Sequence, residues 1–324
     1  MTLSLITGGA GFIGSNLADE LLKMGHKVTV VDNEYSDAHD QFYWNKNTYN
    51  VNCDIRDYKT LKNCMHDVDY VFHFAAEARI QPAIKNPIEA VSINSLGTCT
   101  VLQCAREAGV KKVMYSSTSA GYGLNPYPNV ETQPDDCLNP YSVSKVNGEK
   151  LCKMYTDLYG LKTVIFRYFN VYGDRQPLRG QYAPVIGIFL RQLAAGEPLT
   201  IVGDGEQRRD FVNVKDVCRA NIMAAISNPD DEAYGQVYNV GTGRNYSVNE
   251  IAKMFNTKTT NIEPRPGEAI KFGMFTFIPY AETDSVKIEQ SKTLLIVEPK
   301  QDLLASYNQS VSKIIQKTGP QLIT

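Results

Sequence analysis

Short apolar runs alternate with amphipathic stretches through the first half of the chain. Each run is rich in β-branched residues and is apolar at successive positions, which is typical of a strand buried on both faces of a parallel sheet. Helical patterns separate the runs, and repeated strand–helix units predict a doubly wound α/β sheet. The predicted strands are Leu3 to Thr7, Lys27 to Asp32, Tyr70 to Phe74, Lys112 to Ser116 and Thr163 to Phe166.

The pattern changes at about Gly173, beyond which prolines and glycines separate shorter elements. A chain of 324 residues is long enough for two lobes around a cleft. We predict a sheet domain over residues 1–172 and a smaller α/β lobe over residues 173–324. Segments near 211–241 could return to the sheet, which would make the lobe discontinuous in the chain. Residues 305–324 show the pattern of an amphipathic helix.

Composition and charge narrow the classes of function. Hydrophobic residues make up 43% of the chain, charged residues 21%, and the net charge is −2, as in an ordinary globular protein. We therefore expect neither a nucleic-acid partner nor a membrane partner. The amino terminus lacks the basic segment of a signal peptide, so we expect a cytoplasmic protein. The seven cysteines and four histidines lack metal-ligand spacing, and no metal site is expected.

A glycine-rich turn, Gly8 to Gly14, directly follows the first predicted strand and precedes a helical pattern. Such a turn lets the backbone approach a pyrophosphate at the positive end of the helix. The second predicted strand ends at Asp32, where a carboxylate can accept hydrogen bonds from the adenosine ribose. The same carboxylate would repel a 2′-phosphate, and no arginine adjoins it. The sequence therefore predicts a Rossmann-type domain that binds NAD rather than NADP.

Tyr141 and Lys145 are spaced to share one face of a predicted helix. A nearby ammonium and a bound nicotinamide cation would favour the phenolate, so Tyr141 could act as a general base near neutral pH. Tyr58 and Lys62 have the same spacing, but we expect their helix to be solvated. What distinguishes Tyr141 is the hydroxyl-rich run from Ser116 to Gly123, which closes a buried strand at the edge where such sheets bind ligands.

These features occur together with His73-Phe74-Ala75-Ala76, with Asn94 and with the segment Arg167 to Gly173. The combination resembles the NAD-dependent nucleotide-sugar epimerase and dehydratase family of extended short-chain dehydrogenases, in particular its UDP-glucose 4-epimerase-like group. The resemblance runs from residue 1 to about Gly267. It implies a Rossmann-type doubly wound sheet with a smaller substrate lobe, NAD as the cofactor and a nucleoside-diphosphate sugar as the substrate.

The resemblance also implies roles for individual residues. Thr118, Tyr141 and Lys145 would form the catalytic group, with Thr118 also contacting the sugar. The residues that would bind NAD are Gly8, Gly11, Phe12, Ile13, Gly14, Asp32, Asn33, Asp54, Ile55, Phe74, Ala75, Ala76, Asn94, Ser116, Tyr141, Lys145 and Tyr168. Those that would bind the substrate diphosphate are Asn170, Arg209 and Arg265. A turn or cap role for Asp54 and surface positions for the arginines are the alternatives.

The residues after Thr118 bear on the reaction. Members of the family that eliminate water have an Asp-Glu pair there, and those that decarboxylate a sugar uronate have a glutamate two positions after the threonine. This chain has Ser119 and Ala120, neither of which carries a proton-transfer group. One base and NAD suffice for epimerisation at C4 through a 4-ketose, so we predict an epimerase. A dehydratase, a decarboxylase, a reductase and a non-catalytic NAD-binding protein are the alternatives.

The sequence departs from the family pattern at two places. Arg79 stands where the family often has a small or hydroxyl residue near the sugar, which indicates either an anionic or unusual sugar or a salt bridge at the cleft rim. The stretch from Ala269 to Asp284 is longer and more aromatic than the family pattern. We also expect a homodimer, because the helical patterns Ala90 to Ala108 and Tyr141 to Tyr159 pair across a two-fold axis in the family.

Overall fold

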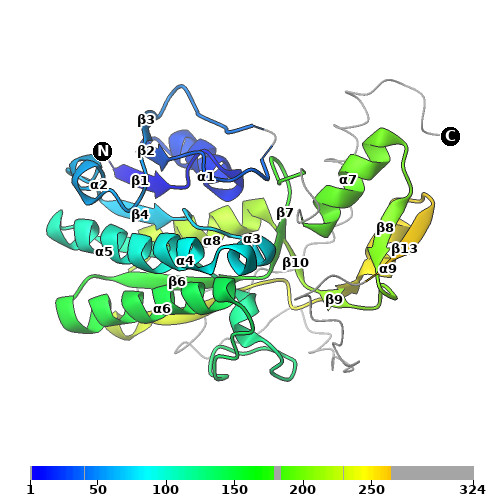
Figure 1. Ribbon diagram of the computed structural model, residues 1–324. Helices are drawn as coiled ribbons and strands as arrows, with labels where there is room; N and C mark the ends of the chain where they lie inside the picture. The colour runs from blue at the N-terminus through cyan, green and yellow to red at the C-terminus, as the bar shows by residue number, and fades with distance from the viewer. Residues whose placement is uncertain (1, 40, 179–183, 229, 264–324) are drawn as a thin grey trace, which may run out of the picture.

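The computed structural model describes residues 2–39, 41–178, 184–228 and 230–263. Arg265, the stretch from Ala269 to Asp284 and the helix predicted over residues 305–324 lie outside these ranges. Within them, a parallel sheet of seven strands has the order β11-β6-β5-β4-β1-β2-β3 (Figure 1). Its strands are β1 Leu3–Thr7, β2 Lys27–Asp32, β3 Tyr49–Asn52, β4 Tyr70–His73, β5 Lys112–Thr118, β6 Thr163–Tyr168 and β11 Gln236–Val240.

The predicted doubly wound parallel sheet is confirmed by this strand order. All the strands predicted in the first half of the chain are present, and β5 and β6 run further than predicted, to Thr118 and Tyr168. The strand β3 was not predicted, because it lies at the edge of the sheet and three of its four residues are exposed. An edge strand of this kind has no continuous apolar run to mark it.

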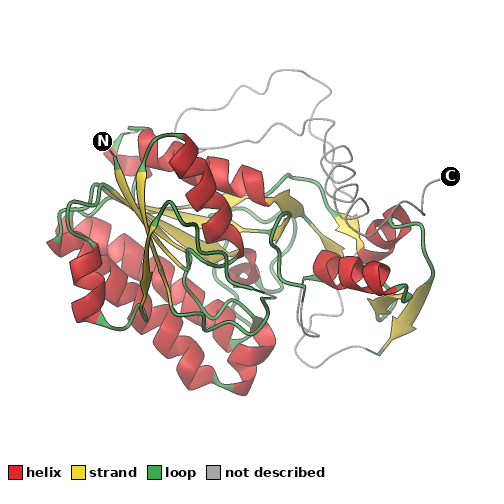
Figure 2. Ribbon diagram, turned by 90° about the horizontal axis from the view of Figure 1, so that it is seen from above, coloured by secondary structure: helices red, strands yellow, loops and turns green. Residues whose placement is uncertain are grey.

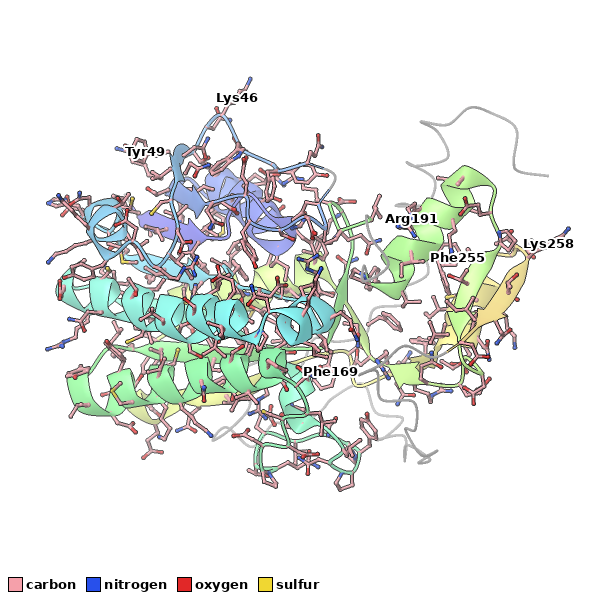
Figure 3. All side chains as sticks on the ribbon, viewed as in Figure 1. Lys46, Tyr49, Phe169, Arg191, Phe255 and Lys258 are labelled. Carbon is pink, nitrogen blue, oxygen red and sulfur yellow. The ribbon has the colours of Figure 1, made fainter. Side chains whose placement is uncertain are left out.

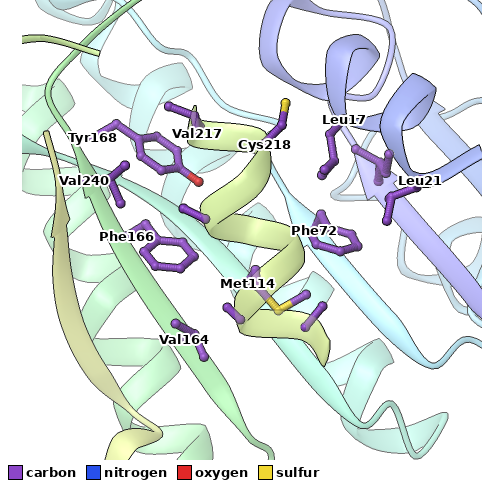
Figure 4. Packing of buried hydrophobic residues seen from close by; sticks show 14 of the residues in the cluster. Leu17, Leu21, Phe72, Met114, Val164, Phe166, Tyr168, Val217, Cys218 and Val240 are labelled. Atoms are coloured by element: carbon purple, nitrogen blue, oxygen red, sulfur yellow. The ribbon is translucent and has the colours of Figure 1, made fainter. Parts of the chain in front are cut away.

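Helices cover both faces of the sheet, as the view from above shows (Figure 2). On one face, α1 (Phe12–Lys23) and α8 (Val214–Ile226) pack together over the strands. Figure 4 shows this side of the core, where Leu17 and Leu21 of α1 and Val217 of α8 join Phe72 and Met114 of the sheet. The other face carries α2 (Tyr58–Cys64), α5 (Thr98–Glu107) and α6 (Pro140–Tyr159). Burial on both faces accounts for the apolar runs of the central strands.

Between α4 (Pro87–Val91) and α5, the helix makes one π-helical turn at Ser92–Gly97. The short helix α3 (Ile80–Lys85) precedes this segment. Single π-turns inserted in α-helices are often found at functional sites. This one lies close to α6, which follows the loop after β5 and the 3-10 turn Ser119–Tyr122.

A smaller lobe with its own apolar core follows β7 (Asn170–Tyr172). It contains α7 (Val185–Ala195), α9 (Val248–Met254), the parallel pair β8 (Leu199–Val202) and β13 (Thr259–Ile262), and the antiparallel pair β9 (Arg208–Arg209) and β12 (Tyr246–Ser247). Phe255, labelled in Figure 3, packs edge-on against Phe189 of α7 with ring centroids 5.5 Å apart.

The chain returns to the large sheet between the two parts of this lobe. β10 (Phe211–Asn213) pairs with β7, after which α8 and β11 join the sheet domain and η3 (Asp231–Ala233) connects them. The predicted domain boundary at residues 172 and 173 stays a prediction. No helix in the described ranges has both the length and the apolar character needed to cross a bilayer.

Candidate active site

Two glycines of the turn between β1 and α1 are required by the fold itself. Gly8 has a φ of +67°, and a Cβ there would lie 2.6 Å from the amide nitrogen of Ala75. A Cβ on Gly14 would lie 2.3 Å from the carbonyl oxygen of Gly8. Gly11 differs, because its φ is −80° and the nearest atom to a Cβ would be 3.4 Å away. A Cβ on Gly11 would be in ordinary contact distance of its neighbours, so the fold itself does not require this glycine, which lies where a dinucleotide pyrophosphate approaches such turns.

Asp32 is fixed at the end of β2 by two backbone amides. Its Oδ2 accepts a hydrogen bond from the Ala10 amide at 3.0 Å, and its Oδ1 accepts one from the Glu34 amide at 2.9 Å. Burial raises the pKa of this carboxyl, and the amide hydrogen bonds oppose that shift. The side chain therefore has a defined position beside the glycine turn, as a ribose-binding carboxylate needs.

At the end of β3, Asp54 forms a close ion pair with Arg56, at 2.7 Å. Hydrogen bonding by Arg56 is the main cause that lowers the pKa of Asp54. Asp54 Oδ1 also accepts the Arg56 amide at 2.8 Å, which is the turn role given as the alternative. Ile55 is buried against Gly97 of the π-turn. The adenine contacts proposed for Asp54 and Ile55 stay predictions.

Asn94, in the π-turn, joins the end of β4 to α6. Its Oδ1 accepts the Glu77 amide at 2.8 Å, and its Nδ2 donates to the Glu77 carbonyl at 3.0 Å and to Ser144 Oγ at 2.9 Å. The segment Phe74 to Ala76 runs between these contacts and the glycine turn, with the Phe74 amide donating to the Thr7 carbonyl at 3.0 Å. The turn thus holds the end of β4 against the helix that carries Tyr141.

The residues predicted to be catalytic come together at the carboxyl end of β5 and the first turns of α6. Asn139 caps α6 by accepting the Ser142 amide at 2.9 Å, so the helix begins just before Tyr141. Thr118 hydrogen-bonds the Tyr141 phenol, and its Oγ1 also accepts the Ala120 amide at 3.1 Å. Lys145 Nζ lies 4.5 Å from the centroid of the Tyr115 ring.

Burial shifts both titratable groups of this cluster. It raises the pKa of Tyr141, an effect opposed by the hydrogen bond to Thr118 and reinforced by the charge of Glu77. Burial also lowers the pKa of Lys145 to about 8. The phenol is therefore protonated in the free protein at neutral pH, and a further nearby cation is needed to favour the phenolate.

Tyr58 and Lys62 have the same four-residue spacing as Tyr141 and Lys145, but they are not buried as that pair is. Lys62 Nζ lies 3.3 Å from the Tyr58 hydroxyl, and both groups are held by Glu107, at 2.6 and 2.5 Å. The Tyr58 side chain is 40% exposed and faces solvent. The expectation that this pair lies on a solvated helix is confirmed.

Two buried carboxylates near the site were not predicted. Glu77 is 3% exposed in the loop that follows β4, and Arg79 donates to both of its oxygens. Glu149 is on the same face of α6 as Tyr141 and Lys145, and Arg167 donates to its two oxygens at 2.8 and 2.7 Å. The spacing of four residues from Lys145 to Glu149 could have identified the second carboxylate from the sequence.

The residues predicted near nicotinamide and diphosphate lie where β6 leads into the small lobe. The Tyr168 side chain is in the core, as Figure 4 shows, and its hydroxyl accepts a hydrogen bond from Asn221 at 2.7 Å. The Ser116 hydroxyl is buried on β5 beside Tyr168. Asn170 donates to the Asp210 carbonyl at 3.0 Å, and Arg209 donates to the Arg208 carbonyl at 2.8 Å.

Arg79 forms ion pairs with Glu77, at 3.2 Å, and with Asp37. Of the two readings of Arg79 left open by the sequence, a salt bridge is what the structure shows.

The model of the NAD dependent epimerase/dehydratase family matches residues 4–241. A UDP-N-acetyl-α-D-glucosaminuronate decarboxylase of Bacillus cytotoxicus is 38% identical over 306 residues, which cover 88% of this chain and 90% of the relative. A UDP-glucose 4-epimerase of Mycolicibacterium smegmatis is 36% identical over 255 residues, or 76% of this chain and 80% of the relative.

Among solved structures, a UDP-N-acetylglucosamine 4-epimerase of Methanobrevibacter ruminantium, in complex with UDP-N-acetylmuramic acid, has a TM-score of 0.84 and 30% identity. The comparison covers 98% of this chain and 99% of that one. The similarity therefore extends over the sheet domain and the small lobe alike.

Proposed function

Because the chain belongs to the NAD dependent epimerase/dehydratase family, we propose that it interconverts the C4 epimers of a nucleoside-diphosphate sugar. The observation that carries this proposal is the group of Thr118, Tyr141 and Lys145, followed by Ser119 and Ala120. The group offers one proton-transfer residue beside the cofactor site, and epimerisation at one carbon needs no more. The residues that fit NAD are those of the glycine turn, where Gly11 is a glycine that the fold itself does not require, and Asp32.

In the proposed reaction, the Tyr141 phenolate accepts the proton of the C4 hydroxyl as the C4–H bond breaks. NAD, held by the glycine turn and Asp32, would supply the hydride chemistry at C4. Thr118 orients the Tyr141 oxygen through their hydrogen bond, and the Lys145 ammonium favours the phenolate. After the 4-ketose has turned its other face, Tyr141 returns the proton to the C4 oxygen, so neither protons nor electrons are left over.

The substrate class rests on the relatives and on three residues. The two epimerases described above act on UDP sugars by name, and we propose a UDP sugar here. Asn170, Arg209 and Arg265 are the proposed ligands of the diphosphate, for which charged donors are suited. Arg265 lies outside the described residues.

Decarboxylation of a sugar uronate is the second candidate, because a decarboxylase is 38% identical over 88% of the chain. The resemblance assigns those members a glutamate two residues after the threonine, where this chain has Ala120. The buried carboxylate of Glu77 does not take that place, since Arg79 donates to both of its oxygens. Epimerisation is therefore the function that we favour.

Proton NMR of purified protein with separate UDP sugars would test the proposal. We expect one or more sugars, from a panel of glucose, N-acetylglucosamine, glucuronate and N-acetylglucosaminuronate, to reach an equilibrium mixture of C4 epimers with no net NADH. Release of CO₂ with formation of a pentose or of a decarboxylated amino sugar would replace epimerisation by decarboxylation. A 4-keto-6-deoxy product would indicate a dehydratase, and unchanged spectra for the whole panel would contradict the proposal.

Homodimerisation is also part of the proposal. Large apolar side chains are exposed on the helices that the family pairs across a two-fold axis, among them Leu158 at 65%, Leu96 at 58% and Val143 at 42% exposure. Burying such side chains against a second copy would stabilise a dimer. Light scattering should give twice the chain mass of 36.1 kDa, and the mass of one chain at micromolar concentration would contradict it.

A cytoplasmic location is the last part of the proposal. The seven cysteines are described and none is in a disulfide, which suits a reducing compartment.

A further inference from the structure

Arg79 and Asp37 form an ion pair between two loops on opposite sides of the glycine turn. Arg79 follows β4 and Asp37 follows β2, and β1 lies between these strands in the sheet. All three strands are parallel, so their carboxyl ends are at the same edge. The ion pair therefore spans the end of β1, where the glycine turn begins and where a dinucleotide pyrophosphate would lie.

The loop after β2 is fastened beside this turn at further points. The Tyr43 amide donates to the Ala10 carbonyl at 2.8 Å, and Asn45 Nδ2 donates to Asp19 of α1 at 2.7 Å. A Cβ placed on Gly11 would lie 3.5 Å from Nε2 of His39. The loop thus extends from Asp32 along the glycine turn, with Asp37 on the side that faces the end of β4.

The other half of the ion pair is held rigidly. Arg79 Nε and its own amide donate to Glu77 Oε1, at 3.2 and 3.0 Å, and Glu77 is buried beside Asn94. The Arg79 side chain is 19% exposed, whereas that of Asp37 is 85% exposed. One side of the bridge is anchored in the protein and the other is at the surface, so the contact can open without disturbing the core.

The charges around Arg79 argue against a role for this residue in binding an anionic sugar. Two carboxylates, Glu77 and Asp37, already pair with its single positive charge. A substrate carboxylate placed there would meet a cluster whose net charge is −1, and it would have to displace Asp37.

We propose that the Arg79–Asp37 ion pair is a clasp that slows the exchange of bound NAD. NAD held in the turn would lie beneath the bridge, and leaving the site would require the bridge to open. Slow exchange suits an enzyme that returns the hydride to the same substrate, but the proposal rests on the NAD site and holds whichever reaction the protein catalyses.

The test is the dissociation rate of the cofactor from the holoenzyme. Protein loaded with NADH is mixed with a large excess of NAD, and the loss of bound-NADH fluorescence is followed in wild type, Asp37→Asn and Glu20→Gln. The control removes the exposed Glu20–Lys23 ion pair of α1, which lies away from the turn and has an N–O distance of 2.7 Å. We expect Asp37→Asn to release NADH about two- to fivefold faster, the range set by exposed ion pairs, and Glu20→Gln to match wild type.

Release rates at raised salt concentration and in a second variant distinguish the clasp from a direct contact between Asp37 and the cofactor. Raising the salt concentration should speed release from wild type more than from Asp37→Asn, because screening weakens the ion pair. In an Arg79→Gln background, Asp37→Asn should add nothing to the rate. Equal rates for wild type and Asp37→Asn would overturn the proposal, and so would a full Asp37→Asn effect without Arg79. Neither result depends on turnover, so failure of the proposed epimerisation would be seen separately.

Discussion

Replacing Gly11 with alanine should separate cofactor binding from folding. The glycine has a φ of −80°, which alanine adopts without strain. An added Cβ would meet no atom nearer than the Gly8 carbonyl oxygen at 3.4 Å. Since the substitution also reduces the freedom of the unfolded chain, the free protein should be as stable as wild type, or more stable by up to about 1 kcal/mol.

The cost should appear only when NAD binds. The methyl group would occupy the space in which the pyrophosphate approaches the backbone of the turn. Forcing an extra methyl into a filled space costs roughly 1–3 kcal/mol, which corresponds to a Kd for NAD raised by about 5- to 150-fold. Gly14→Ala is the contrasting variant, because its Cβ would lie 2.3 Å from the Gly8 oxygen and the turn itself would have to shift.

Calorimetry on protein stripped of cofactor, together with thermal unfolding, would measure both effects. Gly109→Ala serves as a control, since Gly109 has a φ of +68° and no atom within 4 Å of a Cβ. It should lose some stability and keep its NAD affinity, whereas Gly14→Ala should lose both. If Gly11→Ala bound NAD within a factor of about two of wild type, the pyrophosphate would not pass Gly11.

Three further substitutions test the chemistry. Tyr141→Phe should lower kcat by about 10²–10⁴-fold while NAD remains bound, and more than a tenth of wild-type activity would exclude Tyr141 as the base. Wild type should bind NAD at least about tenfold better than NADP. The Asp32→Ser variant should bind NAD more weakly and NADP more tightly than wild type does. If calorimetry showed an unchanged preference, Asp32 would not be part of the ribose site. Lys145, with a pKa of about 8, loses its charge as the pH rises, so kcat/KM should fall above pH 8. Lys145→Arg, which stays charged, should lack that fall in any activity it retains, and a flat wild-type profile to pH 10 would contradict this role.

The parts of the fold and of the site that could be predicted are those that depend on one short, continuous segment of the sequence. The glycine turn, Asp32 at a strand end and the Tyr141–Lys145 spacing each occupy one short segment next to an apolar run or helical pattern. In a parallel sheet the strand ends share one edge, so these segments could be expected to meet without knowing any long-range contact.

Contacts between distant segments could not be predicted in the same way. The Glu77 backbone amide donates to the side chain of Asn94, 17 residues away, and the Glu149 carboxylate pairs with Arg167, 18 residues away. Asp37 and Arg79 are 42 residues apart, on loops whose separation depends on which strand lies between them. The π-turn that positions Asn94 has no distinctive sequence pattern either, because its residues fit an ordinary helix.

The buried pairing of Glu149 bears directly on the charge at the active site. Burial disfavours the Lys145 ammonium, and Glu149, one helical turn further along α6, is an anion that opposes this effect. Arg167 donates to both oxygens of Glu149, and Ser117, next to Thr118 on β5, donates to one of them. The carboxylate is therefore held by a cation that cannot lose its proton, although Arg167 also pairs with Asp135 at 2.7 Å. With both of its oxygens bonded to Arg167, Glu149 leaves Lys145 available for the role proposed for it, which is to favour the Tyr141 phenolate.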